Sequence, residues 1–232
     1  MARQFITGNS NGLGLGLTRF YLDRGDEVLS LSRSPCPLEH QNLHHQVQDL
    51  GDFDAVPAAL EKLLPDTLDL VILNAGILGE IKDLADTSMQ EIRRVMDINV
   101  WSNKIIIDWL IKQQVQVRQM VLISSGASVN GNRGWGAYSI SKASVNMMAK
   151  LYASEMPDTH ITAYAPGIIQ TQMQDYLCKD VDTDKFKSIK GLVDAYETEY
   201  MPDIDTAAQL IADSFKQCLD YDSGSFLDLR QL

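Results

Sequence analysis

Three side chains in the second half of the chain are of types that together could reduce a carbonyl group. Tyr138 and Lys142 lie four residues apart, and Ser125 precedes the tyrosine by thirteen residues. In a helix, residues four apart share one face, so the lysine ammonium would lie near the phenol. A nearby cation lowers the pKa of tyrosine from its usual value of about 10, which favours proton transfer near neutral pH. The trio therefore predicts a proton donor, Tyr138, tuned by Lys142, although two such residues also occur as an ordinary surface pair.

The composition indicates one acidic domain. The 232 residues, 45% of them hydrophobic and 22% charged, suffice for a single α/β core. A net charge of -11 disfavours nucleic acid and anionic membranes as partners. The first residues contain no export signal, and no apolar stretch is long enough to cross a bilayer, so we expect a cytoplasmic protein. The spacing of the three cysteines and four histidines predicts neither a metal site nor a disulfide.

Short apolar runs alternate with longer amphipathic ones along the chain. The runs predict strands at 4–7, 27–31, 43–48, 68–73, 119–123, 161–164 and 225–229. The amphipathic stretches predict helices at 13–24, 53–64, 88–114, 136–155 and 205–219. Strand and helix in alternation predict a doubly wound parallel sheet, because uninterrupted apolar strands are typical of a sheet covered on both faces.

One long irregular stretch interrupts this alternation, at 168–203. It is polar, rich in turn residues and placed just after a predicted strand. We interpret it as a mobile segment that covers the substrate, with a plain surface insertion as the alternative.

A glycine-rich turn joins the first predicted strand to the first predicted helix, with the sequence TGNSNGLG from Thr7. Glycines at this place let the backbone approach a pyrophosphate, whose charge is then held by amides at the positive end of the helix. The expected cofactor contacts are Gly8, Ser10, Asn11, Gly12, Leu13 and Gly14. The turn therefore predicts a dinucleotide site.

The residues after the next two strands bear on which dinucleotide binds. Arg33 follows the second strand, where no carboxylate is available for the 2′-hydroxyl of NAD. A guanidinium can meet a 2′-phosphate through two hydrogen bonds, so NADP(H) is favoured over NAD(H). After the third strand, Asp49 could accept from the adenine amine and Leu50 could cover the ring, with a solvated turn aspartate as the alternative.

These motifs together resemble the short-chain dehydrogenase/reductase family, over nearly the whole chain. The matches are TGNSNGLG, the NAG of Asn74, Ala75 and Gly76, Asn99, Ser125, Tyr138-x-x-x-Lys142 and the PGIIQT that begins at Pro166. Within the family, the chain is most similar to the sepiapterin reductase and benzil reductase branch. The resemblance implies a Rossmann-like sheet of about seven strands in the order 3-2-1-4-5-6-7.

The resemblance also implies roles for individual residues. Ser125 would bind the substrate carbonyl oxygen, Tyr138 would protonate it, and Lys142 would bind the nicotinamide ribose. Asn99 would connect Lys142 to solvent through a water molecule, although a solvent-facing asparagine is the alternative. Further cofactor contacts are expected at Asn74, Ala75 and Gly76 in the floor of the site and at Pro166, Gly167, Ile169 and Thr171 around the carboxamide.

An apolar wall around the reacting carbon would suit a bulky or aromatic ketone or dicarbonyl. Its candidates are Trp135, Met173, Tyr176, Leu177 and Phe186, each of which ordinary core packing explains equally well. Sepiapterin reductases use an aspartate near the C-terminus to anchor the pterin, and Asp228 is placed similarly in this sequence.

The expected activity is an NADPH-dependent carbonyl reductase acting on a small-molecule substrate. The alternatives are an NAD-linked alcohol dehydrogenase and a non-catalytic dinucleotide-sensing protein. The helices at 88–114 and 136–155 carry more apolar residues than one sheet contact needs, so we expect a homodimer, or a homotetramer built from it.

Overall fold

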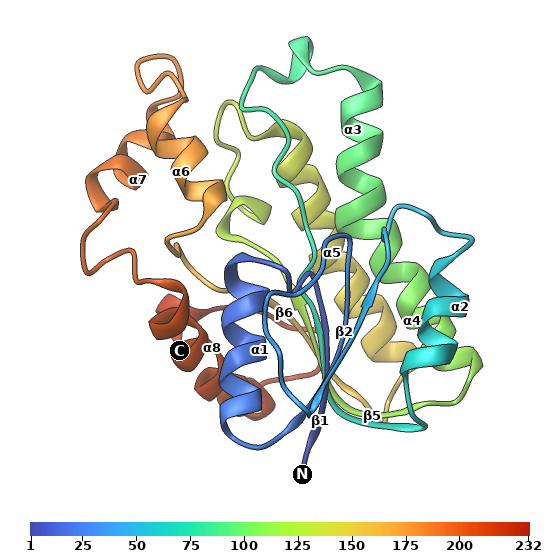
Figure 1. Cartoon of the computed structure of the whole chain (residues 1–232). Helices are drawn as coiled ribbons and strands as arrows, with labels where there is room; N and C mark the ends of the chain where they lie inside the picture. The colour runs from blue at the N-terminus through green and yellow to red at the C-terminus, as the bar shows by residue number, and fades with distance from the viewer.

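Seven parallel strands form one sheet at the centre of the computed structural model, which describes all residues from 1 to 232 (Figure 1). The order across the sheet is β3-β2-β1-β4-β5-β6-β7, which confirms the order that the resemblance implies. In chain order the strands are β1 (Arg3–Thr7), β2 (Glu27–Ser32), β3 (Leu43–Val47), β4 (Thr67–Leu73), β5 (Gln116–Ile123), β6 (His160–Ala165) and β7 (Phe226–Asp228). The order reverses between β1 and β4, which is where an open parallel sheet forms a ligand crevice.

Two helical layers cover the two faces of the sheet (Figure 1). One layer consists of α1 (Gly12–Asp23) and α8 (Ile204–Gln217), and the other of α2 (Val56–Leu63), α4 (Ser102–Lys112) and α5 (Gly136–Glu155). Because successive strand residues point to opposite faces, Ile6 packs with α1 and α8 while Phe5 packs with the other layer. Each face therefore has its own apolar core, and this fixes the register of the strands.

A wide turn interrupts the single helix predicted at 88–114. The segment consists of α3 (Met89–Met96), a π-helical turn η2 (Asp97–Trp101) and α4. Side chains within the turn bond to its own carbonyls: Ser102 Oγ donates to Ile98 O at 2.6 Å, and Asn103 Nδ2 donates to Asn99 O at 2.9 Å. Such π-helical turns often mark functional sites, and this one contains Asn99.

The segment at 168–203 is more ordered than its composition predicts. It forms α6 (Gln172–Lys179), a 3-10 turn η4 (Lys187–Ile189) and α7 (Lys190–Ala195). Leu177, Phe186 and Ile189 of this segment are buried in a small core that also contains Tyr138. The prediction that this stretch is irregular was therefore wrong, because a few well-spaced apolar residues suffice to fold it against the body of the protein. That it covers the substrate stays a prediction.

Four short 3-10 turns complete the secondary structure, namely η1 (Leu84–Asp86), η3 (Gly126–Ser128), η5 (Cys218–Asp220) and η6 (Leu229–Gln231). None of the helices combines the length and apolar character that crossing a bilayer requires.

Candidate active site

A cavity of about 850 Å³ opens along the carboxyl edge of the sheet. Its wall takes residues from the loop after each of the first six strands, among them Gly8, Arg33, Asp49, Asn74, Ser125 and Pro166. The volume lies in the range of ligand and cofactor sites. Segments far apart in the sequence thus converge on one site, as the parallel sheet requires.

The cavity wall is cationic although the chain as a whole is acidic, with a net charge of -11. Five cationic side chains line it, Arg33, Arg93, Arg94, Lys142 and Arg230, against two carboxylates, Asp49 and Asp97. Of the five, Arg230 alone is paired with a carboxylate, that of Asp228, so the other four supply the positive charge. This concentration of positive charge favours an anionic ligand such as a dinucleotide phosphate.

The glycine loop between β1 and α1 forms a cradle at one side of the cavity. Gly8 and Gly12 adopt positive φ angles of 75° and 55°, which disfavour any other residue. A Cβ atom at Gly14 would lie 2.2 Å from Gly8 O, so this position is closed to side chains. α1 begins at Gly12 with no acidic residue in its first turn, and its positive end therefore faces the cavity uncompensated. The cradle fits a pyrophosphate.

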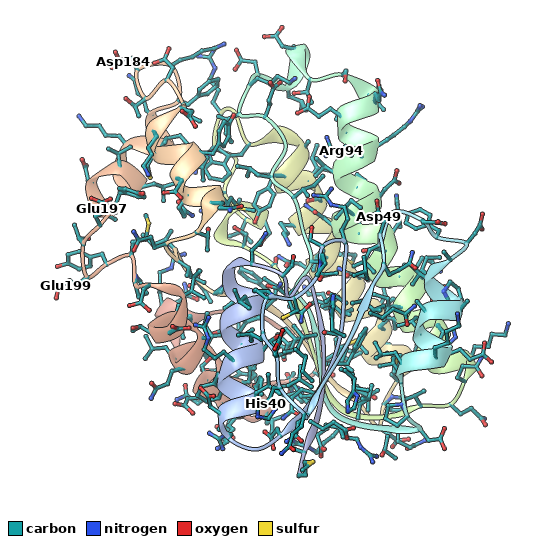
Figure 2. The ribbon with its side chains drawn as sticks, in the orientation of Figure 1. His40, Asp49, Arg94, Asp184, Glu197 and Glu199 are labelled. Atoms are coloured by element: carbon teal, nitrogen blue, oxygen red, sulfur yellow. The ribbon has the colours of Figure 1, made fainter.

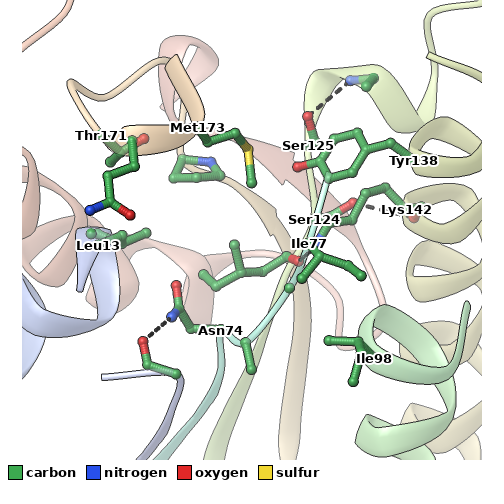
Figure 3. A pocket seen from close by; sticks show the side chains of 18 of the residues that line it. Leu13, Asn74, Ile77, Ile98, Ser124, Ser125, Tyr138, Lys142, Thr171 and Met173 are labelled. Atoms are coloured by element: carbon green, nitrogen blue, oxygen red, sulfur yellow. Dashed lines mark hydrogen bonds between the residues drawn. The ribbon is translucent and has the colours of Figure 1, made fainter. Parts of the chain in front are cut away.

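Asn74, at the end of β4, fixes the glycine loop from below (Figure 3). Its Nδ2 donates to Thr7 O at 3.0 Å and to Gly8 O at 3.2 Å. In return, Thr7 Oγ1 accepts from the backbone amides of Asn74 and Ala75 at 3.0 and 3.1 Å. These hydrogen bonds hold the glycine loop and the segment after β4 as one rigid unit. A cofactor site of defined shape needs such rigidity.

The far end of the cavity is formed by the loop after β3 and by α3. Asp49 Oδ1 accepts from Gly51 N at 2.9 Å, and Leu50 is buried. A Cβ atom at Gly51 would lie 3.2 Å from Ile98 Cδ1, and Arg94 lies one helical turn before Ile98. Figure 2 shows Arg94 on α3 and Asp49 at this end of the molecule.

Sequence reasoning missed the residues that α3 contributes to the wall. They share one stripe of the helix and its π-helical continuation, namely Gln90, Arg93, Arg94, Asp97 and Ile98. The spacing of three and four residues was present in the sequence. Nothing local, however, indicated which face of the predicted helix would meet the cavity.

Arg33, after β2, is exposed, lines the same cavity and makes no ion pair.

Tyr138, Lys142 and Ser125 meet in the middle of the cavity (Figure 3). Tyr138 and Lys142 both come from the first turns of α5, with Lys142 Nζ 5.7 Å from the centre of the phenol ring. Ser125 follows β5, and its Oγ accepts from Ala127 N at 3.1 Å. The Ser125 and Tyr138 hydroxyl groups lie beside one another in Figure 3. Two hydroxyl groups can therefore reach one carbonyl oxygen.

Burial, rather than a neighbouring charge, is the main cause of the shifted pKa values of Tyr138 and Lys142. Burial raises the pKa of Tyr138, and the Ser125 hydroxyl beside it acts in the opposite direction. Burial also lowers the pKa of Lys142 to about 8. The sequence predicted a lowered phenol pKa, and the structure differs because the Lys142 ammonium donates to Ile123 O at 2.7 Å instead. The phenol thus keeps its proton at neutral pH, as a proton donor must.

Asn99 lies behind Lys142 and is fully buried, so the solvent-facing alternative is wrong. Its Nδ2 donates to Ile77 O and to Ser141 Oγ, both at 2.9 Å, and its Oδ1 accepts from Ile77 N at 2.8 Å. Ser141 Oγ in turn donates to Tyr138 O at 2.7 Å. Asn99 therefore ties the loop after β4 to the helix that carries Tyr138.

A second polar network holds the Ser125 loop against α5. Ser124 Oγ donates to Asn146 Oδ1 at 2.5 Å, Asn146 Nδ2 donates to Ser128 Oγ at 2.8 Å, and Ser128 Oγ donates to Ser125 O at 2.6 Å. Sequence reasoning missed Asn146. The sequence did contain a signal for Asn146, because it lies four residues after Lys142, as Lys142 lies four after Tyr138, and therefore shares their face of the helix.

The residues around PGIIQT close the cavity from the side opposite α3. Pro166, Gly167, Ile169 and Thr171 all line it. A Cβ atom at Gly12 would lie 3.6 Å from Thr171 Cγ2, which places this loop over the glycine loop. Thr171 precedes α6, and its side chain makes no capping hydrogen bond, so the hydroxyl group remains available to a ligand.

Only part of the predicted apolar wall reaches the cavity. Trp135, Met173 and Leu177 line it, and Trp135 Nε1 donates to Ser188 Oγ at 3.0 Å. Tyr176 and Phe186 do not line it, and they pack instead in the small core beneath Tyr138.

Besides Tyr176 and Phe186, the predicted site residues that do not line the cavity are Gly14, Asn99 and Asp228. Gly14 and Asn99 lie directly behind it. Asp228 is buried, and its carboxylate accepts from Arg230 Nε at 2.8 Å and from Arg230 Nη2 at 2.5 Å. From this C-terminal stretch, Arg230 reaches the wall in place of the predicted aspartate.

Comparisons with known proteins agree with this geometry. The family model for short chain dehydrogenases matches residues 3–182. An uncharacterized oxidoreductase of Schizosaccharomyces pombe is 34% identical over 215 residues, which cover 89% of this chain and 84% of that protein. The (S)-benzoin-forming benzil reductase of Saccharomyces cerevisiae is 29% identical, over 89% of this chain and 87% of its own. A crystal structure of a Saccharomyces cerevisiae short-chain dehydrogenase/reductase superposes with a TM-score of 0.85 at 24% identity, covering 99% and 96% of the two chains.

Proposed function

Because the chain belongs to the short-chain dehydrogenase/reductase family of oxidoreductases, we propose that it is an NADPH-dependent reductase of ketones and dicarbonyls. The observation that carries the proposal is the meeting of the Ser125 and Tyr138 hydroxyls with Lys142 in a cavity that also contains the glycine cradle. Proton donor and dinucleotide site thus share one edge of the sheet.

In this proposal each part of NADPH would find a partner in the cavity. The cradle of Gly8, Gly12 and the start of α1 would hold the pyrophosphate, and Leu50 and Ile98 would cover the adenine. Arg33, with Arg93 and Arg94 on the facing helix, would hold the 2′-phosphate end. Ile169 and Thr171 would hold the carboxamide. When bound, the dihydronicotinamide supplies hydride to the carbonyl carbon of the substrate.

The side chains of the site supply the proton and stabilise the developing charge. Ser125 donates a hydrogen bond to the carbonyl oxygen, and Tyr138 transfers its phenolic proton to that oxygen as the carbon is reduced. Lys142, with a pKa of about 8, is mostly charged at neutral pH and stabilises the phenolate that remains. Asn99 holds the backbone of this helix in place and lies on the route by which a proton returns to Lys142.

The apolar wall supports a bulky or aromatic ketone or dicarbonyl as substrate. Trp135, Met173 and Leu177 line the cavity and pack in the same small core as Tyr138, and a relative is named as a benzil reductase. The test is NADPH oxidation by the purified protein with diketones, quinones, aldehydes, steroids and pterins. Turnover of diketones or aromatic ketones above the others supports the proposal, and an absence of turnover on every carbonyl contradicts it.

Arg33→Ser should weaken NADPH binding selectively. The variant loses the charge-assisted hydrogen bonds to the 2′-phosphate, so we expect the Kd of NADPH to rise at least about tenfold. The Kd of NADH should stay within about twofold, since NADH has no such phosphate. Both constants are measured by fluorescence titration of the protein. Arg24→Ser, at the far end of α1, is the matched control. Equal changes for both dinucleotides, or no change at all, would rule out this role of Arg33.

We also propose that the protein forms a homodimer through α4 and α5. Ile140, Met147 and Leu151 lie on one stripe of α5, and they are 43%, 55% and 58% exposed, respectively. Trp101, on the neighbouring π-helical turn, is 43% exposed. A second copy of the chain would bury these side chains from both sides around a two-fold axis.

The double variant Met147→Glu, Leu151→Glu should be monomeric in light scattering after size-exclusion chromatography, because it places four charges in the paired surface. Leu210→Glu, exposed on α8 across the sheet, is the control and should leave the dimer intact. If Leu210→Glu dissociates the protein instead, the interface lies on α8.

A further inference from the structure

One cation in the cavity has no part in the proposed chemistry or in cofactor binding. Arg230 lies in η6, directly after β7, and lines the cavity beside the loop that contains Ser125. Its position relative to Ser125 is given by the next residue: a Cβ atom at Gly126 would lie 3.2 Å from Arg230 Nη2. The guanidinium therefore lies beside Gly126, the residue that directly follows Ser125.

Asp228 holds this guanidinium in one orientation. Oδ1 of Asp228 accepts from Nε and from the backbone amide of Arg230, and Oδ2 accepts from Nη2. Asp228 is buried, whereas the Arg230 side chain is 65% exposed. A guanidinium has five N–H groups, and this pairing uses two of them. The other three make no hydrogen bond within the protein and are free to bind a ligand.

The pairing of Arg230 with Asp228 also favours a neutral ligand over an anionic one. The Asp228 carboxylate offsets the charge of Arg230, so the pair as a whole is neutral. A neutral oxygen atom can accept from the free N–H groups without approaching an uncompensated charge. A carboxylate placed there would meet repulsion from Asp228, which lies 4.0 Å from the Cβ position at Gly126.

We propose that Arg230 is a specificity-determining residue that binds the second oxygen of a 1,2-dicarbonyl substrate while Ser125 and Tyr138 bind the first. In a 1,2-dicarbonyl the two oxygens belong to adjacent carbons, so a group beside Gly126 would bind the second oxygen while Ser125 binds the first. The inference rests on the proposed reductase function and narrows its substrate class. Asp228 acts as a positioning residue that orients the guanidinium.

The test compares 1-phenyl-1,2-propanedione with propiophenone, which has the same skeleton but lacks the second oxygen. The third substrate is phenylglyoxylate, in which a carboxylate replaces the acetyl group. For each protein we take kcat/KM with NADPH and form the ratio of the diketone to the monoketone. Dividing the variant's ratio by that of the wild type removes the intrinsic reactivity of the substrates. In Arg230→Gln this ratio should fall about tenfold, because one charge-assisted hydrogen bond is lost.

Arg230→Lys should recover only part of the ratio, since an ammonium cannot keep both the fork with Asp228 and a bond to the substrate. The control is Arg3→Gln, which removes an arginine paired with Glu27 at the opposite edge of the sheet and should leave the ratio unchanged. Isothermal calorimetry should show unchanged NADPH binding in Arg230→Gln.

The outcomes separate this inference from the function on which it rests. A wild-type protein that reduces none of the three compounds or any other carbonyl contradicts the reductase function itself. A wild-type protein that reduces them, with a ratio that Arg230→Gln leaves within twofold, overturns the role of Arg230 alone. A preference for phenylglyoxylate that disappears in Arg230→Gln also overturns it, because Arg230 would then serve as an anion site.

Discussion

Replacement of Tyr138 by phenylalanine should abolish carbonyl reduction while leaving the binding of NADPH almost unchanged. The substitution removes one oxygen atom and preserves the ring, which packs with Leu177, Phe186 and Ile189. Loss of a positioned proton donor typically costs between about 10² and 10⁴ in rate. We therefore expect kcat to fall by about 10³, with a Kd for NADPH within about twofold of that of the wild type.

The matched control is Tyr152→Phe in the same helix. Tyr152 is also buried, but its hydroxyl donates to Asp108 and lies outside the cavity wall. This variant should keep its turnover even if its stability falls. Single-turnover measurements with NADPH would show whether the chemical step itself is slowed in Tyr138→Phe. If Tyr138→Phe keeps more than a tenth of wild-type turnover, Tyr138 is not the proton donor.

Lys142→Met should be more stable than the wild type at pH 7 and nearly inactive. The folded protein lowers the pKa of Lys142 from 10.5 to about 8, so the buried charged form costs about 3 kcal/mol below pH 8. Methionine has a similar length and no charge. The lost hydrogen bond to Ile123 O offsets about 1 kcal/mol of the gain. We expect a melting temperature higher by roughly 5 °C and a loss of at least about 10² in kcat.

The pH dependence of this difference has a definite sign. Below pH 8 lysine is protonated in both the folded and the unfolded chain, and the full burial penalty is present. Between pH 8 and 10.5 the folded wild type loses the proton while the unfolded chain keeps it, so wild-type stability rises with pH. The advantage of Lys142→Met in calorimetry should therefore shrink over this window. Lys150→Met, exposed on the same helix, should show no such trend. A variant that is less stable than the wild type at pH 7 would contradict the burial penalty.

The sheet and the cavity edge could be predicted because their signals are local. The apolar runs around Ile6, Val71 and Val121 fixed the strands, and the glycine turn, the NAG sequence and Ser125 each follow a strand directly. Since parallel strands end at one edge, the convergence of these motifs followed from their order alone. The predicted site residues that fall outside the cavity wall are Gly14, Asn99, Tyr176, Phe186 and Asp228.

What could not be predicted depends on partners distant in the chain. The π-helical turn at Asp97–Trp101 is not visible in the periodicity of its segment, yet it contains Asn99, whose amide bonds to Ile77 and Ser141. The helical character of 172–195 likewise depends on burial of Leu177 and Phe186 beside Tyr138.

The amino-acid pattern by itself predicted the strands, their parallel arrangement and the edge at which the motifs meet, because periodicity and turn chemistry act over a few residues. The strand order came from the resemblance to the short-chain dehydrogenase/reductase family. Tertiary structure alone decided where each side chain finds its partner. The Lys142 ammonium bonds to the Ile123 carbonyl, burial raises the pKa of Tyr138, and Asp228 is paired with Arg230, which reaches the cavity in its place. The physical reason is that hydrogen-bond partners and burial are set by packing between elements far apart in the chain, to which no local pattern is sensitive.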